Sequence, residues 1–167
     1  QMCIETAPCT YLSVSGARWY YHPEDKDLPI EQRRPHPNFP TRAQDRKEAI
    51  EFFLALANAD IPRIAIENPV GIMSKLFHKP NQIVQPYWFG DEATKTTCLW
   101  LKNLPQLTPT KIVGKGERVV LSSGKSLPKW YSDSFNTKIS TEMRRTLRSK
   151  TFQGFADAMA EQWSKLL

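Results

Sequence analysis

A thiol directly after a proline is the first feature of this chain that can do chemistry. Cys9 follows Pro8 in an apolar run that continues past Ser13 and ends at Gly16. A cysteine held at a strand end, beside groups that lower its pKa from about 8.5, acts as a nucleophile. The alternative is a small buried apolar side chain, which is the usual role of a cysteine outside a disulfide.

A carboxylate and an amide close a second apolar run. Residues 63–66 are mostly β-branched or small, and Glu67, Asn68 and Pro69 follow them. In an open α/β sheet, ligands bind outside the carboxyl ends of the strands. We therefore expect Cys9 and Glu67 to converge on one site, since the chain between them is long enough for a crossover helix.

Residue periodicity predicts the elements that position these groups. Thr41 and Gln44 match a capping box, and apolar residues recur at helical spacing from Ala43 to Ala57. Cys98 alternates with Trp100 in a strand and is expected in the core. The expected elements are a strand over 2–7, a loop over 8–16, an irregular loop over 23–40, a helix from Thr41, strands over 63–66, 82–90, 96–101 and 117–121, a short helical turn within 71–79, and a final helix led by Gly154.

Basic and aromatic residues indicate where a polyanion would bind. The cluster over 17–22 either stacks on bases or covers an edge of the core. Residues 103–141 are rich in Pro, Gly, Ser and Lys, which favours a loop-rich binding insertion, with DNA recognition as its candidate role. Two further groups are either phosphate-facing or solvated: Arg33, Arg34 and His36, and Arg144, Arg145, Arg148 and Lys150.

Length, charge and cysteine content narrow the class of protein. A chain of 167 residues fits one domain over residues 1–167. The net charge of +6 suits a polyanionic partner. Three cysteines at irregular spacing argue against a disulfide framework and for a reducing compartment, the cytoplasm. We expect no membrane span and no metal site, because long apolar stretches and ligand motifs are missing from the sequence.

The order of these features resembles the cytosine-C5 DNA methyltransferases, and more closely the short phage and prophage proteins labelled DNA cytosine methyltransferase-like. That family's nucleophile motif after its fourth strand matches Pro8-Cys9, and its motif after the fifth strand matches Glu67-Asn68. Its aromatic-glycine turn, followed by basic residues and a strand, is similar to Phe89-Gly90 with Lys95. Its final glycine-led helix, which helps close the cofactor pocket, resembles residues 154–158.

The resemblance implies an α/β fold with a partial Rossmann-type sheet of the class I methyltransferase kind, flanking helices and a loop-rich insertion. It implies that Cys9 adds to C6 of a flipped-out cytosine, that Glu67 holds N3 and the exocyclic amine, and that S-adenosylmethionine is the cofactor. DNA is the implied partner. On this interpretation the remaining site residues are Pro8, Ser13, Arg18, Asn68, Pro69 and Lys95 toward the substrate, and Gly154 and Ala156 toward the cofactor.

The family's glycine-rich first cofactor motif has no counterpart here, so the resemblance is to a C-terminal portion. Three explanations stay open: a preceding half supplies the rest, a second chain supplies it, or the cofactor function has been lost. Two other functions stay open. One is a non-catalytic methyltransferase-like factor of a phage that binds DNA or a protein, and the other is pyrimidine nucleotide modification of the thymidylate synthase kind. The expected location is the cytoplasm of a bacterial host or of a phage-infected cell.

Overall fold

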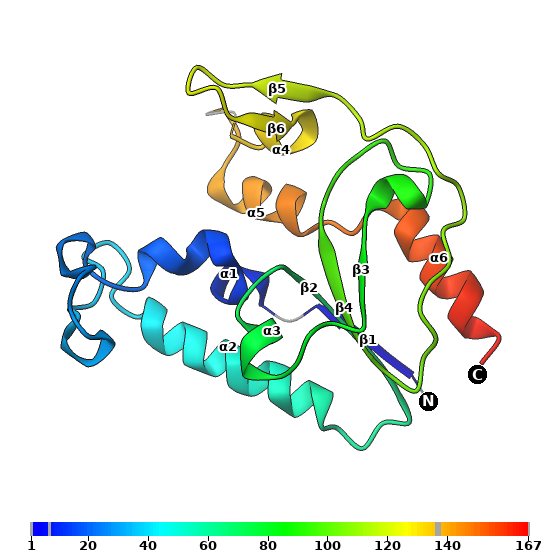
Figure 1. Ribbon diagram of the computed structural model, residues 1–167, viewed down its shortest axis with the longest axis horizontal. Helices are drawn as coiled ribbons and strands as arrows, with labels where there is room; N and C mark the ends of the chain where they lie inside the picture. The colour runs from blue at the N-terminus through cyan, green and yellow to red at the C-terminus, as the bar shows by residue number, and fades with distance from the viewer. Residues whose placement is uncertain (1, 7, 136–137, 167) are drawn as a thin grey trace. The chain divides into compact units, whose positions relative to one another are not determined.

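The computed structural model describes residues 2–6, 8–135 and 138–166 and shows a mixed α/β chain (Figure 1). Ala7, the last residue of the strand expected over 2–7, lies outside the described residues, as do residues 136 and 137 of the expected insertion. The other undescribed residues are the two terminal ones.

The chain divides into two compact units, which we describe separately. Unit 1 contains the residues up to Ile83 together with Thr97–Leu104, and unit 2 contains Val84–Thr96 together with the residues from Pro105 onward. A single methyltransferase-like domain over 1–167 stays a prediction.

Unit 1 carries the residues predicted to do chemistry. Its elements, with η marking a 3₁₀-helix, are β1 (Met2–Thr6), α1 (Cys9–Leu12), η1 (Val14–Trp19), η2 (Pro23–Asp25), η3 (Ile30–Gln32), α2 (Arg42–Ala57), β2 (Arg63–Pro69), α3 (Met73–Leu76) and β4 (Thr97–Lys102). Strand β3 (Gln82–Val84) ends just beyond the unit's sequence limit.

Unit 2 contains mostly short elements and one longer helix. They are η4 (Pro86–Trp88), β5 (Arg118–Val120), β6 (Ser126–Pro128), α4 (Lys129–Asp133), α5 (Thr141–Ser149) and α6 (Gln153–Ser164). The predicted final helix is confirmed as α6, which buries Phe155, Met159 and Trp163 at helical spacing. The indole N–H of Trp163 donates to the carbonyl of Pro105 at 3.0 Å, so α6 is tied to the segment that enters this unit.

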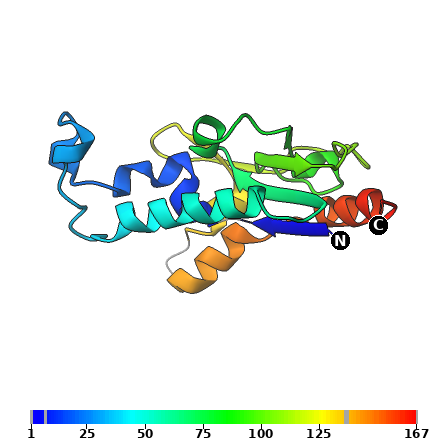
Figure 2. The ribbon, with the colours of Figure 1, turned by 90° about the horizontal axis from the view of Figure 1, so that it is seen from below.

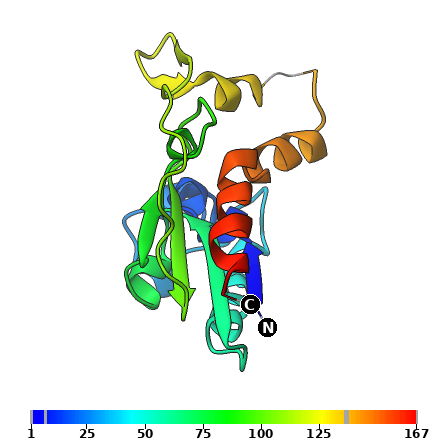
Figure 3. The ribbon, with the colours of Figure 1, turned by 90° about the vertical axis from the view of Figure 1, so that its right-hand side faces the viewer.

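The four-stranded sheet is mixed, with strand order β1-β2-β4-β3 (Figure 3). Strands β1 and β2 are parallel, and Thr6 lies opposite Glu67. Strand β4 runs antiparallel to β2. A parallel pair needs a crossover connection, which α2 supplies here, so the predicted crossover helix is confirmed.

Helix α2 covers one face of this sheet (Figure 2). Its buried residues Ala49 and Phe53 are four apart and therefore lie on one side of the helix. The Phe53 ring meets the Trp100 ring edge to face, with centroids 5.1 Å apart. The buried residues of this core are Leu12, Ala49, Phe53, Ile64, Ile66, Met73, Cys98 and Trp100, which confirms the core position expected for Cys98.

Two local predictions in unit 1 are wrong. The segment after Pro8 is helical rather than a loop: the fixed φ of proline suits a helix start, and the Ser13 N–H closes the first turn on the Cys9 carbonyl at 3.0 Å. The capping box at Thr41 does not form. Thr41 already has helical dihedrals, whereas a cap is extended, and its hydroxyl donates to the Asp45 carboxylate instead.

Two predicted strands are shorter than expected. The strand expected over 82–90 ends at Val84, because Pro86 has no N–H for the ladder and begins η4. The strand expected over 117–121 is present as β5, but it is paired with β6 in a hairpin within the expected insertion. Gly124, with φ of 78°, makes the turn of that hairpin.

The irregular loop expected over 23–40 contains a buried carboxylate, Asp25, that is paired with Arg34. Asp25 is 4% exposed, and its carboxylate accepts from the backbone N–H of Arg34 at 2.8 Å and from its guanidinium at 2.6 Å. These bonds lower the pKa of Asp25 from its ordinary 3.8 to about 2. The loop is therefore fixed around Asp25 as long as that carboxylate is ionised.

Protonation of Asp25 is expected to release this loop. Because the folded pKa is the lower one, the stabilisation is present above about pH 4 and is lost as the pH falls toward 2. Hydrogen exchange of the Arg34 amide measures this loss of stabilisation. In the native chain, protection of the amide should fall as the pH is lowered from about 4 to 2. In Asp25→Asn, protection should be weak and independent of pH. Amides of α2 monitor global unfolding. Glu24→Gln is the control, since Glu24 is exposed and makes a single 3.2 Å contact with Arg34. Equal Arg34 protection in Asp25→Asn and the native chain would contradict this role.

Candidate functional site

Cys9 is the first residue of α1, just beyond the end of β1. Its side chain is half-buried, and Pro8 before it is exposed. Thr6, the last residue of β1, lies opposite Glu67 in the parallel pair. Adjacent strands are about 4.8 Å apart, and three residues extend at most about 10 Å. The backbone thus places Cys9 close to the end of the strand that carries Glu67.

Glu67 and Asn68 occupy the carboxyl end of β2. Both are buried, with 6% and 1% exposure, and Pro69 after them is half-buried. Side chains alternate along a strand, so Glu67 lies on the face opposite to Ile64 and Ile66, which pack in the core with α2. An acidic side chain of such low exposure is uncommon.

Backbone hydrogen bonds join the segment after Cys9 to the segment after Glu67. The Val14 N–H donates to the Val70 carbonyl at 3.3 Å, and the Ile72 N–H donates to the Leu12 carbonyl at 3.0 Å. Gly71 makes this approach possible, since a Cβ there would lie 2.0 Å from the Leu12 oxygen. The two predicted site segments are thereby held side by side, with Ser13 bridged to Gly71.

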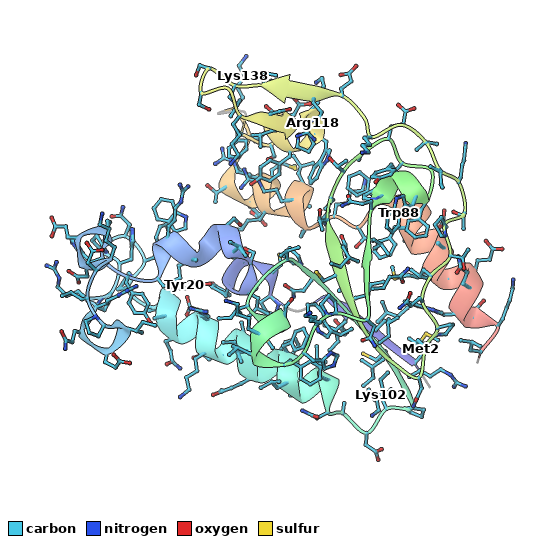
Figure 4. The ribbon with its side chains drawn as sticks, viewed as in Figure 1. Met2, Tyr20, Trp88, Lys102, Arg118 and Lys138 are labelled. Carbon is cyan, nitrogen blue, oxygen red and sulfur yellow. The ribbon has the colours of Figure 1, made fainter. Side chains whose placement is uncertain are left out.

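Arg42, at the start of α2, supports the Cys9 segment from the other side. Its guanidinium donates to the Thr10 carbonyl at 3.2 Å and lies 5.5 Å from the centroid of the Tyr11 ring. The hydroxyl of Tyr20, labelled in Figure 4, donates to the Tyr11 carbonyl. Burial raises the pKa of Tyr20, so the hydroxyl keeps the proton that this bond uses. Sequence reasoning missed both Gly71 and Arg42, because neither belongs to a motif and only the fold brings them to the site.

The other two cysteines are poorly suited to be nucleophiles. Burial raises the pKa of Cys98, which lies in the core. Burial, and then the nearby charge of Glu5, raises the pKa of Cys3 on β1. A raised pKa leaves less thiolate, which is the reactive form. Of the three thiols, that of Cys9 lies just beyond the end of β1, the strand that pairs with the Glu67 strand.

Arg18 lies in the last turn of η1 and belongs to unit 1 with Cys9. Its guanidinium is 4.6 Å from the ring centroid of Trp19. The neighbouring aromatic residues mostly cover an edge of the core: Trp19 packs edge to face against His36 and Phe39. Of the predicted alternatives for the 17–22 cluster, the core-edge role is thus shown for Trp19 and for the buried Tyr20.

The three residues of the 23–40 loop considered for a phosphate-facing role make bonds within the loop. Arg34 is paired with Asp25 and Glu24. Arg33 donates to the carbonyls of Leu28 and Lys26, both at 2.8 Å. His36 is buried, and its Nδ1 accepts from the Asn38 N–H. These three side chains organise the loop, and the phosphate-facing role stays a prediction for Arg33, whose charge is not paired with a carboxylate in these bonds.

The other predicted site residues belong to unit 2. The ammonium of Lys95 donates to the Lys150 carbonyl at the end of α5 at 3.0 Å. The Gly154 N–H donates to the Asp91 carboxylate at 2.8 Å, and a Cβ on Gly154 would lie 1.9 Å from the Phe89 oxygen. Ala156 is half-buried in α6, with its N–H on the Phe152 carbonyl.

The surroundings of Gly154 bear on S-adenosylmethionine. The space beside its Cα is filled by this chain's own backbone, and its N–H and that of Ala156 are both bonded within unit 2. The described geometry therefore explains Gly154 by packing and shows no cradle fitted to that cofactor. Cofactor contact by Gly154 and Ala156 stays a prediction.

The basic group on α5 is partly structural. Arg144 donates to the Ser134 carbonyl and Arg148 to the Ser134 hydroxyl, each at 2.9 Å. The Arg148 guanidinium lies 4.4 Å from the centroid of the Phe135 ring. Hence two of these arginines hold the end of α4 against α5, whereas Arg145 and Lys150 are exposed.

The described parts of the chain contain neither a cluster of potential metal ligands nor a helix able to span a membrane. Across residues 2–6, 8–135 and 138–166, no three acidic, histidine or cysteine side chains gather as a metal site would need. Over the same residues, every helix is too short or too polar to cross a bilayer.

The contact at Gly71 gives a test of the site's architecture. Gly71→Ala forces the backbone away from Leu12 and breaks the Ile72–Leu12 bond, so we expect the free energy of unfolding to fall by about 1–3 kcal/mol. Urea denaturation followed by circular dichroism measures it. Gly114→Ala is the control, because no atom lies within 4 Å of its added Cβ, and its effect should stay within about 0.5 kcal/mol. Equal effects of the two substitutions would refute the close-contact argument.

Comparison with known proteins does not assign the chain to a family. No protein-family model matches the chain, and no curated protein matches it.

Proposed function

We propose that this chain is a DNA cytosine-C5 methyltransferase-like protein that activates a flipped-out cytosine through Cys9 and Glu67. The observation that carries the proposal is the parallel pairing of β1 and β2, which sets Thr6 opposite Glu67 and so brings a thiol and a buried carboxylate to neighbouring strand ends. The pair of strands with its crossover helix is also what a Rossmann-type sheet requires.

Cys9 supplies the nucleophile in this chemistry. Its thiolate forms a bond to C6 of cytosine, and the electron pair of the C5–C6 double bond moves toward C5 and the ring. C5 then carries the electron density needed to attack an electrophile. After C5 has accepted its new substituent, it loses its proton, the C5–C6 double bond re-forms, and the thiolate leaves.

Glu67 supports the addition from the other edge of the base. Its carboxyl group holds N3 and the exocyclic amine, and in its protonated form it donates to N3 while accepting from the amine. A donor at N3 draws electron density out of the ring and so favours attack at C6. Burial of Glu67 keeps water away from these bonds, which strengthens them.

S-adenosylmethionine would supply the methyl group as an electrophile attached to a sulfonium. The described residues show no cradle for it. The base-activating chemistry belongs to this chain's own residues and can be tested without the cofactor. The net charge of +6 supports DNA as the substrate, since phosphates attract cations over a distance.

Exchange of the cytosine C5 hydrogen tests the role of Cys9. After thiolate addition, C5 can accept a deuteron from D₂O and then lose its original proton as the thiolate leaves, with no methyl donor needed. We expect duplex DNA incubated with the native chain in D₂O to gain deuterium at cytosine C5, read by mass spectrometry of the nucleosides. Cys9→Ser should abolish the gain, because a serine hydroxyl is far less nucleophilic than a thiolate.

Cys3→Ser is the matched control and should leave exchange unchanged, since Cys3 lies on β1 with a raised pKa. Exchange that persists in Cys9→Ser would refute the nucleophile. DNA binding by the native chain without any exchange would favour the non-catalytic factor instead. Exchange on free deoxycytidine monophosphate in preference to duplex DNA would favour nucleotide modification.

Glu67→Gln separates proton transfer from binding. An amide can still donate to N3 and accept from the amine, but it cannot transfer a proton, so we expect the C5 exchange rate to fall by about 100-fold with little change in DNA affinity. Glu51→Gln on the exposed part of α2 is the charge-matched control. An unchanged exchange rate in Glu67→Gln would remove Glu67 from the mechanism.

A further inference from the structure

A pocket in unit 1 has no role in the base-activating chemistry. It has a volume of about 260 Å³ and is formed by the end of η1, the residues that lead into η2, and three residues of the 23–40 loop. The residues that line it are Ala17, Arg18, Tyr21, His22, Pro23, Lys26 and Arg33. Three of these carry a positive charge, and the lining contains no carboxylate.

The pocket brings three cations together beside four carboxylates of the same loop. Glu24 and Asp25 are paired with Arg34, and Glu24 also lies 3.6 Å from Nδ1 of the lining residue His22. Asp27 and Glu31 are exposed. Arg33 is fixed by bonds to two carbonyl groups, which are uncharged, so its own charge stays available. Arg18 and Lys26 are exposed as well.

The walls of the pocket are held in place before any ligand arrives. The His22 N–H donates to the Arg34 carbonyl at 2.9 Å, and Tyr21 is bridged to Pro35. The Arg33 guanidinium lies 5.8 Å from the centroid of the Tyr21 ring. A site whose cations are already positioned loses less entropy on binding. Rigid walls are expected for a binding site and not for a solvated loop.

The volume of the pocket and the side chains that line it limit the class of ligand that it can bind. Pockets for whole small molecules measure about 300–1,000 Å³, so this one suits a single anionic group with part of its neighbour. Guanidinium and ammonium groups together are the usual partners of phosphate oxygens. Tyr21 offers an apolar surface beside them, on which a sugar or base can rest.

We propose that this pocket binds a phosphodiester group of the DNA strand, with Arg18, Lys26 and Arg33 as its cationic contacts and Tyr21 as the wall for the adjoining nucleoside. The inference rests on the proposed function for the identity of the ligand as DNA. Helix η1 connects α1 to the pocket and spans six residues, about 12 Å at the 3₁₀ rise. The pocket therefore holds the strand a few nucleotides from the base that Cys9 receives.

The test is DNA affinity across a range of salt concentrations. The full chain carrying Cys9→Ser, without methyl donor, is titrated into a fluorescein-labelled duplex and followed by anisotropy, so that chemistry plays no part. Arg18→Gln with Lys26→Gln should weaken binding about tenfold, as expected for lost charge-assisted bonds. The slope of log affinity against log salt should fall by about 1 to 2, one unit for each phosphate contact.

Lys47→Gln with Lys75→Gln is the matched control, because both lysines are exposed in unit 1 on α2 and α3 and the loss of charge is equal. Thermal unfolding checks that both double variants fold. If the two double variants bind equally well, or if the native chain binds no DNA, the pocket assignment is overturned. Free deoxycytidine monophosphate competing only at millimolar concentration supports a strand phosphate, whereas competition at the DNA affinity would overturn it in favour of a nucleotide site.

The outcomes separate this inference from the proposed function. Pocket-dependent DNA binding without C5 exchange would leave the pocket in place and refute the chemistry. Exchange that proceeds while the Arg18 and Lys26 variant keeps full affinity would refute the pocket alone.

Discussion

The close backbone contact between Gly71 and Leu12 is the constraint on which the candidate site depends. It allows the segment after β1 to bond to the segment after β2, and these segments carry the thiol and the buried carboxylate. Sheet pairing between β1 and β2 ends with the Thr6–Glu67 pair. The two hydrogen bonds beyond the strand ends continue that alignment into the loops.

A close backbone contact at a glycine is also found in unit 2. Gly154 brings the first turn of α6 onto the Phe89 carbonyl, and the Asp91 carboxylate accepts its N–H. The rings of Phe89 and Phe155 pack 5.5 Å apart beside this contact. In each unit, a glycine next to an aromatic or apolar core residue fixes a turn against a neighbouring segment. Gly154, which the sequence motif assigns to the cofactor, thus also has a role in packing.

Much of the fold follows from patterns that the sequence makes visible. Helix α2, strands β1, β2 and β4, and helix α6 have strong periodicity and were predictable, and so was the core position of Cys98. Short elements were not. Helix α1 has only four residues, and strand β6 pairs only because Gly124 turns the chain. The capping prediction at Thr41 failed because residue types fit a box while the backbone is already helical there.

The candidate site was predictable only in part, for a related reason. Cys9 and Glu67 can be found in the sequence because each lies beside an apolar run. The helix between the two runs implies that their strands are parallel. Gly71 and Arg42 carry no such mark, since their importance comes from atoms far away in sequence, such as the Thr10 and Leu12 carbonyl oxygens. The ion pair of Asp25 with Arg34 was hidden for the same reason within a loop that has no period.

The division of the chain into units has a consequence for how the protein folds and for how it can be dissected. The chain leaves unit 1 at Val84, forms the first part of unit 2, and returns to unit 1 at Thr97 to add β4. Unit 2 then resumes at Pro105. Neither unit is a continuous stretch, so no single truncation yields either one intact. The antiparallel pairing of β2 with β4 must wait for this excursion to close, which adds loop-closure entropy to the folding barrier. Ribosomal synthesis therefore cannot finish unit 1 until part of unit 2 has already emerged.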